Sequence, residues 1–264
     1  MNFAASARKR ARAWVDADDD SAALPRFRAT YFVIWLVYDT LDVAMGYTER
    51  ARDWFPHPRS IELVALQLGL VASGLLMLAT RRVYFYGMMS AALRLMVALV
   101  FFRLNDFLFC AVVTLLLAHS DGGPFESDRK PKWVRDVLLV QLGWVYFATA
   151  LLKANPDWLS GGHLFVRTEY LARGLGWPYP AFLRAAFARL PVDAALAKLA
   201  IGSELLLAGV LWARRPYWLG VALVTGIHTF GTLVTNVWFF SAQTIAAVVL
   251  LLPRRRALTD ASGS

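Results

Sequence analysis

The side chains in this sequence best suited to chemistry are polar residues within, or at the ends of, long apolar runs. Lys153 closes one such run, and Thr149 and Tyr146 precede it by four and seven residues, so the three share one helix face. His228 lies just past the middle of a later run. An amine and an imidazole in apolar surroundings are candidates for acid–base chemistry. Taken alone, a boundary lysine more commonly extends its amine into water, and a helix histidine more commonly bonds a neighbouring helix.

A second group of polar residues lies elsewhere in the chain. Asp39 and Asp42 are three residues apart and so share a helix face, while Asn105 and Asp106 begin a further apolar run. Charges at membrane depth usually face a cavity or one another. We therefore expect these four side chains, together with Trp158, to line an outward-facing polar cavity with Lys153 and His228.

Two charges fall near the middle of apolar runs. At 1.5 Å per residue, Arg94 lies roughly 16 Å and Glu204 roughly 14 Å from the inner ends of their helices. These similar depths predict an ion pair between Arg94 and Glu204, most simply one that fixes helix packing.

Residue types and spacing exclude several kinds of site. Cys110 is the single cysteine, which excludes an intrachain disulfide and a cysteine metal site. His57, His119 and His163 are scattered over ends and connections, so we expect no metal. No nucleophile triad or phosphate-binding loop is present in the sequence.

The composition places the chain among membrane proteins, with 58% hydrophobic residues among 264. We expect an all-α, polytopic bundle of about eight spanning helices, since a helix of about 20 apolar residues crosses the hydrocarbon layer. Because the fourth and eighth are short, seven or nine remain alternatives. The expected spans are Phe27–Tyr47, Ile61–Thr80, Val83–Phe102, Asn105–His119, Trp133–Lys153, Val192–Ala213, Pro216–Asn236 and Trp238–Leu252.

The net charge of +9 is gathered in short basic clusters between the apolar runs. In an eight-crossing arrangement these clusters fall on one side, which the positive-inside rule assigns to the cytoplasm. We therefore expect cytoplasmic tails at residues 1–25 and 254–264, around a membrane domain at 26–253. The clusters indicate contact with membrane lipid rather than nucleic acid. They are Arg8–Arg12, Arg81–Arg82, Arg129–Arg135, Arg214–Arg215 and Arg254–Arg256.

The outer connection after the fifth span, Ala154–Pro191, is rich in aromatic residues and arginines. Its stretches Gly162–Leu175 and Tyr179–Leu190 have the pattern of amphipathic helices lying in the membrane interface. A strap on the membrane surface is the simpler interpretation, and a gating lid is the alternative.

Three segments resemble the vitamin K-dependent γ-carboxylase-like, or HTTM, membrane family. YFATALLKANPDWLSGG, at Tyr146–Gly162, resembles its motif of aromatic and small residues, a lysine and an Asp-Trp pair. IHTFGTLVTNVWFFS, at Ile227–Ser241, resembles a motif in which a helix histidine precedes Phe-Ser by about a dozen residues. RFRATYFVIWLVYD, with Arg28 and Asp39, resembles the first helix of the family. The resemblance spans about residues 25–253.

The resemblance implies a function for the lysine. In the carboxylase, the family lysine is the base that takes a proton from reduced vitamin K, and the matching residue here is Lys153. It therefore implies a vitamin K-type quinone as cofactor and catalytic roles for Lys153 and His228. The chemistry needs a neutral amine, which apolar surroundings favour.

The sequence departs from the carboxylase pattern in three places. Asn105–Asp106 stands where the carboxylase has a catalytic histidine. Gly231, Thr232 and Leu233 replace the Asn and Gln that follow the motif histidine. The sequence ends at Ser264, without the large extramembrane domain that binds the protein substrate, so full peptide γ-carboxylation is not expected.

Two other functions are consistent with the sequence. One is a non-catalytic membrane component for the maturation or export of a partner protein or peptide. The other is a small-solute transporter, which the absence of an internal repeat disfavours. We expect membrane lipid as a partner, a protein or peptide substrate as a further one, and no nucleic acid.

Overall fold

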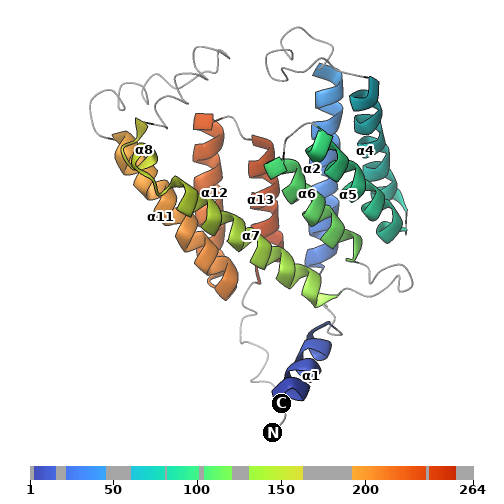
Figure 1. Ribbon diagram of the computed structural model, residues 1–264, viewed down its shortest axis with the longest axis horizontal. Coiled ribbons are helices and arrows are strands. Elements are labelled where there is room, and N and C mark those ends of the chain that lie inside the picture. The colour runs from blue at the N-terminus through green and yellow to red at the C-terminus, as the bar shows by residue number, and fades with distance from the viewer. Residues whose placement is uncertain are drawn as a thin grey trace, which may run out of the picture. The chain divides into compact units, whose positions relative to one another are not determined.

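The computed structural model describes residues 3–15, 22–45, 61–80, 82–100, 104–120, 131–162, 192–235 and 238–253 (Figure 1). The regular secondary structure in these ranges is helical, which confirms the expected all-α class. The helices are α1 (Phe3–Val15), α2 (Ala23–Met45), α4 (Ile61–Ala79), α5 (Val83–Val100), α6 (Leu104–Ala118), α7 (Lys132–Lys153), α8 (Pro156–Leu159), α11 (Val192–Ala213), α12 (Tyr217–Thr235) and α13 (Trp238–Leu251).

Each of the eight expected apolar segments is a helix, with ends within a few residues of the expected ones. Two further helices, α1 and α8, were not expected. The amphipathic helices expected at Gly162–Leu175 and Tyr179–Leu190 lie outside the described residues, apart from Gly162. The expected C-terminal tail also lies outside them.

Two helices among the described residues are long and apolar enough to cross a membrane, Lys132–Lys153 and Ala194–Ala213. Four others are apolar over shorter lengths: Ala65–Ala79, Val83–Val97, Phe109–Ala118 and Ser241–Leu251. The helical fold and these two helices are consistent with a membrane location. The count of eight crossings stays a prediction.

The chain forms two compact units, Met1–Leu138 and Leu139–Ser264, and α7 begins in the first and continues in the second. In the first unit, α2, α4, α5 and α6 pack in chain order, each against the next. The helical repeat determines which side of α2 is buried. Phe27, Tyr31 and Trp35 recur every four residues on its buried side, while Val33 and Val37 on another side are exposed.

A glycine allows α5 and α6 to approach closely. A Cβ atom at Gly87 would lie 2.6 Å from the Cβ of Ala118, far inside van der Waals contact. Small residues facing each other in this way let two backbones pack tightly, as is common between helices in membranes.

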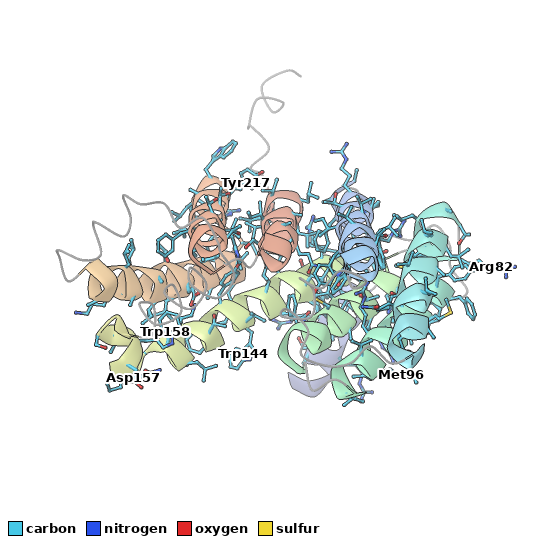
Figure 2. All side chains as sticks on the ribbon, turned by 90° about the horizontal axis from the view of Figure 1, so that it is seen from above. Arg82, Met96, Trp144, Asp157, Trp158 and Tyr217 are labelled. Atoms are coloured by element: carbon cyan, nitrogen blue, oxygen red, sulfur yellow. The ribbon has the colours of Figure 1, made fainter. Side chains whose placement is uncertain are left out.

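The second unit contains most of α7, with α8, α11, α12 and α13. Along α7, a buried face formed by Leu139, Leu142, Tyr146 and Ala150 follows the helical repeat. The opposite side is apolar as well, and Trp144 on it is 61% exposed and points away from the helix (Figure 2). Packing in this unit joins α11 to α12, α12 to α13, and α8 to α11.

Candidate functional site

Lys153, the last residue of α7, forms an ion pair with a carboxylate from α11. Its Nζ donates a hydrogen bond to Oε1 of Glu204. The Glu204 side chain is only 6% exposed and the Lys153 side chain 25% exposed, so the pair has one buried and one partly accessible end. The lysine is thus held by a specific partner rather than extended freely into solvent.

An indole borders the same lysine. The Lys153 Nζ lies 5.4 Å from the centroid of the Trp158 ring, within the range of a cation–π interaction. Trp158 belongs to the short helix α8, which begins where the side chain of Asn155 accepts a hydrogen bond from the Trp158 backbone N–H at 3.1 Å. Pro156 follows at the first helical position, where a missing N–H does no harm. The Asn-Pro pair after Lys153 is a local signal that could have predicted α8.

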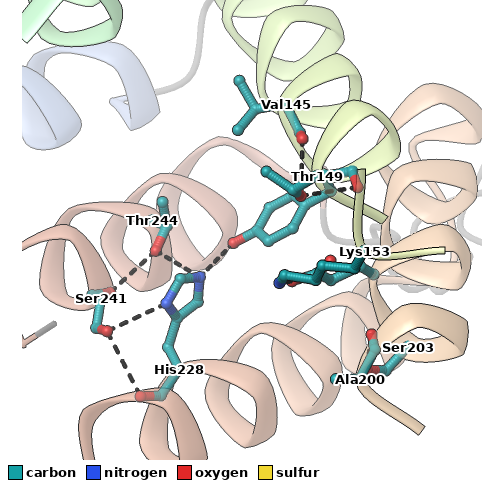
Figure 3. Close-up of polar contacts among 10 residues, drawn as sticks. Val145, Thr149, Lys153, Ala200, Ser203, His228, Ser241 and Thr244 are labelled. Carbon is teal, nitrogen blue, oxygen red and sulfur yellow. Dashed lines mark hydrogen bonds and ion pairs between the residues drawn. The ribbon is translucent and has the colours of Figure 1, made fainter. Parts of the chain in front are cut away.

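His228 in α12 is surrounded by hydroxyl groups (Figure 3). Its Nε2 lies 2.5 Å from the Tyr146 hydroxyl and 2.9 Å from Thr244 Oγ1, and its Nδ1 lies 3.1 Å from Ser241 Oγ. Thr232 Oγ1 in turn donates to Ser241 Oγ at 3.0 Å. Each hydroxyl can donate or accept, so this chain of contacts can satisfy a neutral imidazole and can also pass a proton along it.

The histidine and lysine groups lie near each other. Tyr146 and Lys153 are on the same side of α7, and the charge on Lys153 is close enough to act on His228. The charge on Glu204 likewise acts on Tyr146. The structure therefore brings together four of the residues singled out from the sequence, on α7, α11 and α12.

One carboxylate oxygen among these residues has no hydrogen-bond partner in the described part of the chain. Oε2 of Glu204 is buried and has no hydrogen-bond partner among the residues that the structure describes. A buried carboxylate oxygen without a partner is unfavourable, because it has lost its hydration without replacement. Oε2 can therefore still accept a hydrogen bond, although Thr149 of α7 lies near enough to act on the same carboxyl group.

The expected pairing of Arg94 with Glu204 is corrected by the structure, since Glu204 pairs with Lys153. Arg94 is fully buried in the first unit, with its guanidinium 3.5 Å from the centroid of the Trp35 ring. The error came from comparing depths alone. Distance along a helix axis says nothing about which way a residue faces or which helices are neighbours.

The remaining expected cavity residues belong to the first unit. Asp39 and Asp42 are on α2, and Asn105 and Asp106 are on α6, but their side chains lie outside the described residues. Their place in a shared cavity therefore stays a prediction. Thr149 donates its hydroxyl hydrogen to backbone carbonyls of its own helix, at 2.9 Å to Val145 and 3.0 Å to Tyr146.

Two partnerships were missed from the sequence. Glu204 was recognised as buried but given the wrong partner, and Ser241 was noted only as part of a motif. In the structure, the histidine and serine of that motif bond each other although they are thirteen residues apart. Thr232, one helical turn after His228, was a signal that this face of α12 is polar.

Within the described ranges, no group of three or more His, Cys, Asp or Glu side chains is arranged to hold a metal ion. Comparison of the chain with protein-family models, with curated proteins and with solved structures gives no match. The resemblance to the γ-carboxylase-like family therefore rests on the sequence motifs alone.

Proposed function

We propose that this chain is a multi-pass membrane protein with eight crossings and cytoplasmic termini, carrying an acid–base site at Lys153 on the outer side. The two helices of membrane-crossing length and composition support the membrane location. The basic clusters in alternate connections support the orientation.

The distribution of polar and apolar side chains also supports a lipid environment. Trp218, Leu152 and Phe85 are 75%, 76% and 62% exposed, whereas the charged Arg94 and Glu204 are buried. Large exposed apolar side chains are unfavourable in water when they form continuous patches, and they suit hydrocarbon. Charged side chains buried inside the protein are also expected in a lipid environment, because hydrocarbon solvates charges poorly.

The observation that carries the proposed chemistry is the ion pair between Lys153 and Glu204. Transfer of one proton from Nζ to the carboxylate converts the ammonium and carboxylate into an amine and a carboxylic acid. Apolar surroundings favour this neutral form, because they solvate charges poorly. The free amine can then accept a proton from an acidic O–H group of a lipid-soluble substrate, which leaves an ammonium beside the substrate anion. Release of the proton held by Glu204 to solvent then restores the ion pair.

A quinone of the vitamin K type is the cofactor we propose. The residues present fit its chemistry, because the Lys153 amine offers hydrogen-bond donors, Glu204 Oε2 offers an acceptor, and Trp158 offers an aromatic face. When bound, the quinone would supply the redox chemistry. The role of the chain would be to hold the quinone oxygens and to move protons at Nζ of Lys153 and, through the Tyr146 hydroxyl, at Nε2 of His228.

Substitution by arginine tests this function. Lys153→Arg preserves the positive charge and can still pair with Glu204, but a guanidinium does not release its proton at ordinary pH. The assay follows oxidation of an added reduced quinone by dissolved dioxygen in the presence of the purified protein, and mass spectrometry measures quinone retained after mild detergent extraction. We expect Lys153→Arg to be as inactive as Lys153→Ala. Full activity of the arginine variant would eliminate the lysine base.

The orientation has its own test. In a Cys110→Ala background, Ser160→Cys should react with an impermeant maleimide on intact cells, and Ser262→Cys should not. Reaction of Ser262→Cys alone would reverse the orientation.

A second function is favoured by one observation. The nitrogens of His228 are both engaged by hydroxyls of the chain itself, an arrangement that also serves to fix helix packing. This suits a non-catalytic component that supports the maturation or export of a partner protein. A protein that co-purifies with the chain, together with an active Lys153→Arg variant in a complementation assay, would favour this function.

A further inference from the structure

The N-terminal helix α1 is basic over most of its surface. Among its thirteen residues, Arg8, Lys9, Arg10 and Arg12 are exposed and basic, and none is acidic. Ala7, Ala11 and Trp14 follow one another at intervals of four and three residues, so they share a narrow face, which Arg10 borders. Basic residues on a helix that also carries an exposed tryptophan are typical of a helix in a membrane interface.

A side-chain hydrogen bond joins α1 to the rest of the first unit. Trp14 Nε1 donates to Oδ2 of Asp136 at 2.9 Å, which fixes the end of α1 beside the start of α7 (Figure 1). The Asp136 side chain is buried, but the Trp14 side chain is still 41% exposed. The indole can thus bond the protein through its nitrogen and contact a further apolar phase through its ring.

Other basic and aromatic side chains gather at the same end of this unit. Arg28 Nη1 at the start of α2 donates to Ser120 Oγ after α6 at 2.8 Å. The ring of His119 lies between those of Tyr84 and Trp133, with centroids 5.1 Å and 5.9 Å away. Aromatic rings and basic residues at the ends of helices are typical of the boundary between a membrane and the cytoplasm.

We propose that α1 lies on the cytoplasmic surface of the membrane and binds the phosphate headgroups of anionic phospholipids. This inference rests on the membrane location proposed above. Four cations without an acid on the helix match an anionic surface, and guanidinium groups bind phosphate oxygens in pairs. The hydrogen bond from Trp14 holds the helix at the level where those headgroups lie.

The residues that follow α1 in the sequence are acidic: Asp16, Asp18, Asp19 and Asp20. Opposite charges are thus segregated along the chain, and only the basic segment is attracted to an anionic surface. This segregation supplies a matched control, because neutralising four acids and neutralising four bases should shift the binding in opposite directions.

The experiment places a fluorophore on α1 of the full-length protein in lipid nanodiscs. In a Cys110→Ala background, Ala11→Cys on the apolar face carries an environment-sensitive dye. We expect a blue shift in discs containing phosphatidylglycerol, none in discs of phosphatidylcholine alone, and loss of the shift at high salt. Inorganic phosphate added to the neutral discs should produce no shift.

Charge variants complete the experiment. Changing Arg8, Lys9, Arg10 and Arg12 together to Gln should lower the ratio of docked to undocked α1 by about tenfold or more. Changing the three arginines to Lys should preserve docking, and changing the four aspartates to Asn should increase it.

Equal emission in both lipids, or docking retained in the Gln variant, overturns the proposal. A shift induced by added RNA in neutral discs would overturn it in favour of nucleic acid. A chain that does not incorporate into discs refutes the membrane location itself.

Discussion

Removing the charge of Lys153 should destabilise the protein more than removing the charge of Glu204, although the two form one ion pair. The asymmetry follows from their exposure, which is 25% for the lysine side chain and 6% for the glutamate. In Lys153→Met a buried carboxylate loses its partner and cannot reach water. In Glu204→Gln the lysine can turn its amine outward on its flexible stem, where Trp158 also stabilises it.

The magnitudes follow from the general cost of breaking buried pairs. Loss of one partner costs roughly 3–5 kcal/mol when both groups are fully buried. Because one end of this pair is partly accessible, we expect about 2–4 kcal/mol for Lys153→Met and about 1–2 kcal/mol for Glu204→Gln. The double variant removes both charges and should lose only about 1–2 kcal/mol, which corresponds to a coupling of about 3 kcal/mol.

The free energy of unfolding can be measured by titrating the protein with sodium dodecyl sulfate in mild detergent micelles, with tryptophan fluorescence as the signal. Lys198→Met is the matched control, because Lys198 is an exposed lysine on α11 and should change stability by less than about 0.5 kcal/mol. If the two single losses simply add in the double variant, Lys153 and Glu204 are not energetically coupled and the reasoning fails.

Three other substitutions test the packing of the second unit by the same titration. Gly143→Ala places a Cβ 2.5 Å from Nε1 of Trp212 and should destabilise by about 1–3 kcal/mol, whereas Gly202→Ala meets nothing within 4 Å and should be neutral or slightly stabilising. Equal effects of the two alanines would show that α7 and α11 do not approach closely at Gly143. Tyr146→Phe removes the hydroxyl bonded to His228 and should cost about 1–2 kcal/mol, and a loss below about 0.5 kcal/mol would argue against that bond.

The helices of this chain were largely predictable from the sequence, because long apolar runs separated by basic turns have few alternative structures. The segment Val192–Ala213 coincides with α11 at both ends. The short helix α8 was missed, since four residues are too few for a periodic pattern and only the capping residues signal it. Helix α1 was missed because its basic residues were interpreted as a topology signal rather than as part of a helix.

The residues of the site were easier to predict than their partners. Lys153, Tyr146 and His228 were singled out by type and by apolar surroundings, and the structure brings them near one another. The pairing of Lys153 with Glu204 could not be deduced, because it depends on how α7 and α11 face each other across an intervening stretch of fifty residues. Sequence spacing determines faces within one helix and leaves the contacts between helices open.

The order in which the chain is synthesised determines when the hydroxyl contacts of His228 can form. Tyr146 is synthesised first, His228 follows much later, and Ser241 and Thr244 arrive only with α13. Since chains are made from the N-terminus onward, the imidazole is synthesised before these two hydroxyls exist. The hydroxyl contacts of His228 are therefore complete only when α13 has been made. A chain truncated before α13 would retain Lys153, Glu204 and the contact of His228 with Tyr146, but it would lose the contacts of the imidazole with Ser241 and Thr244.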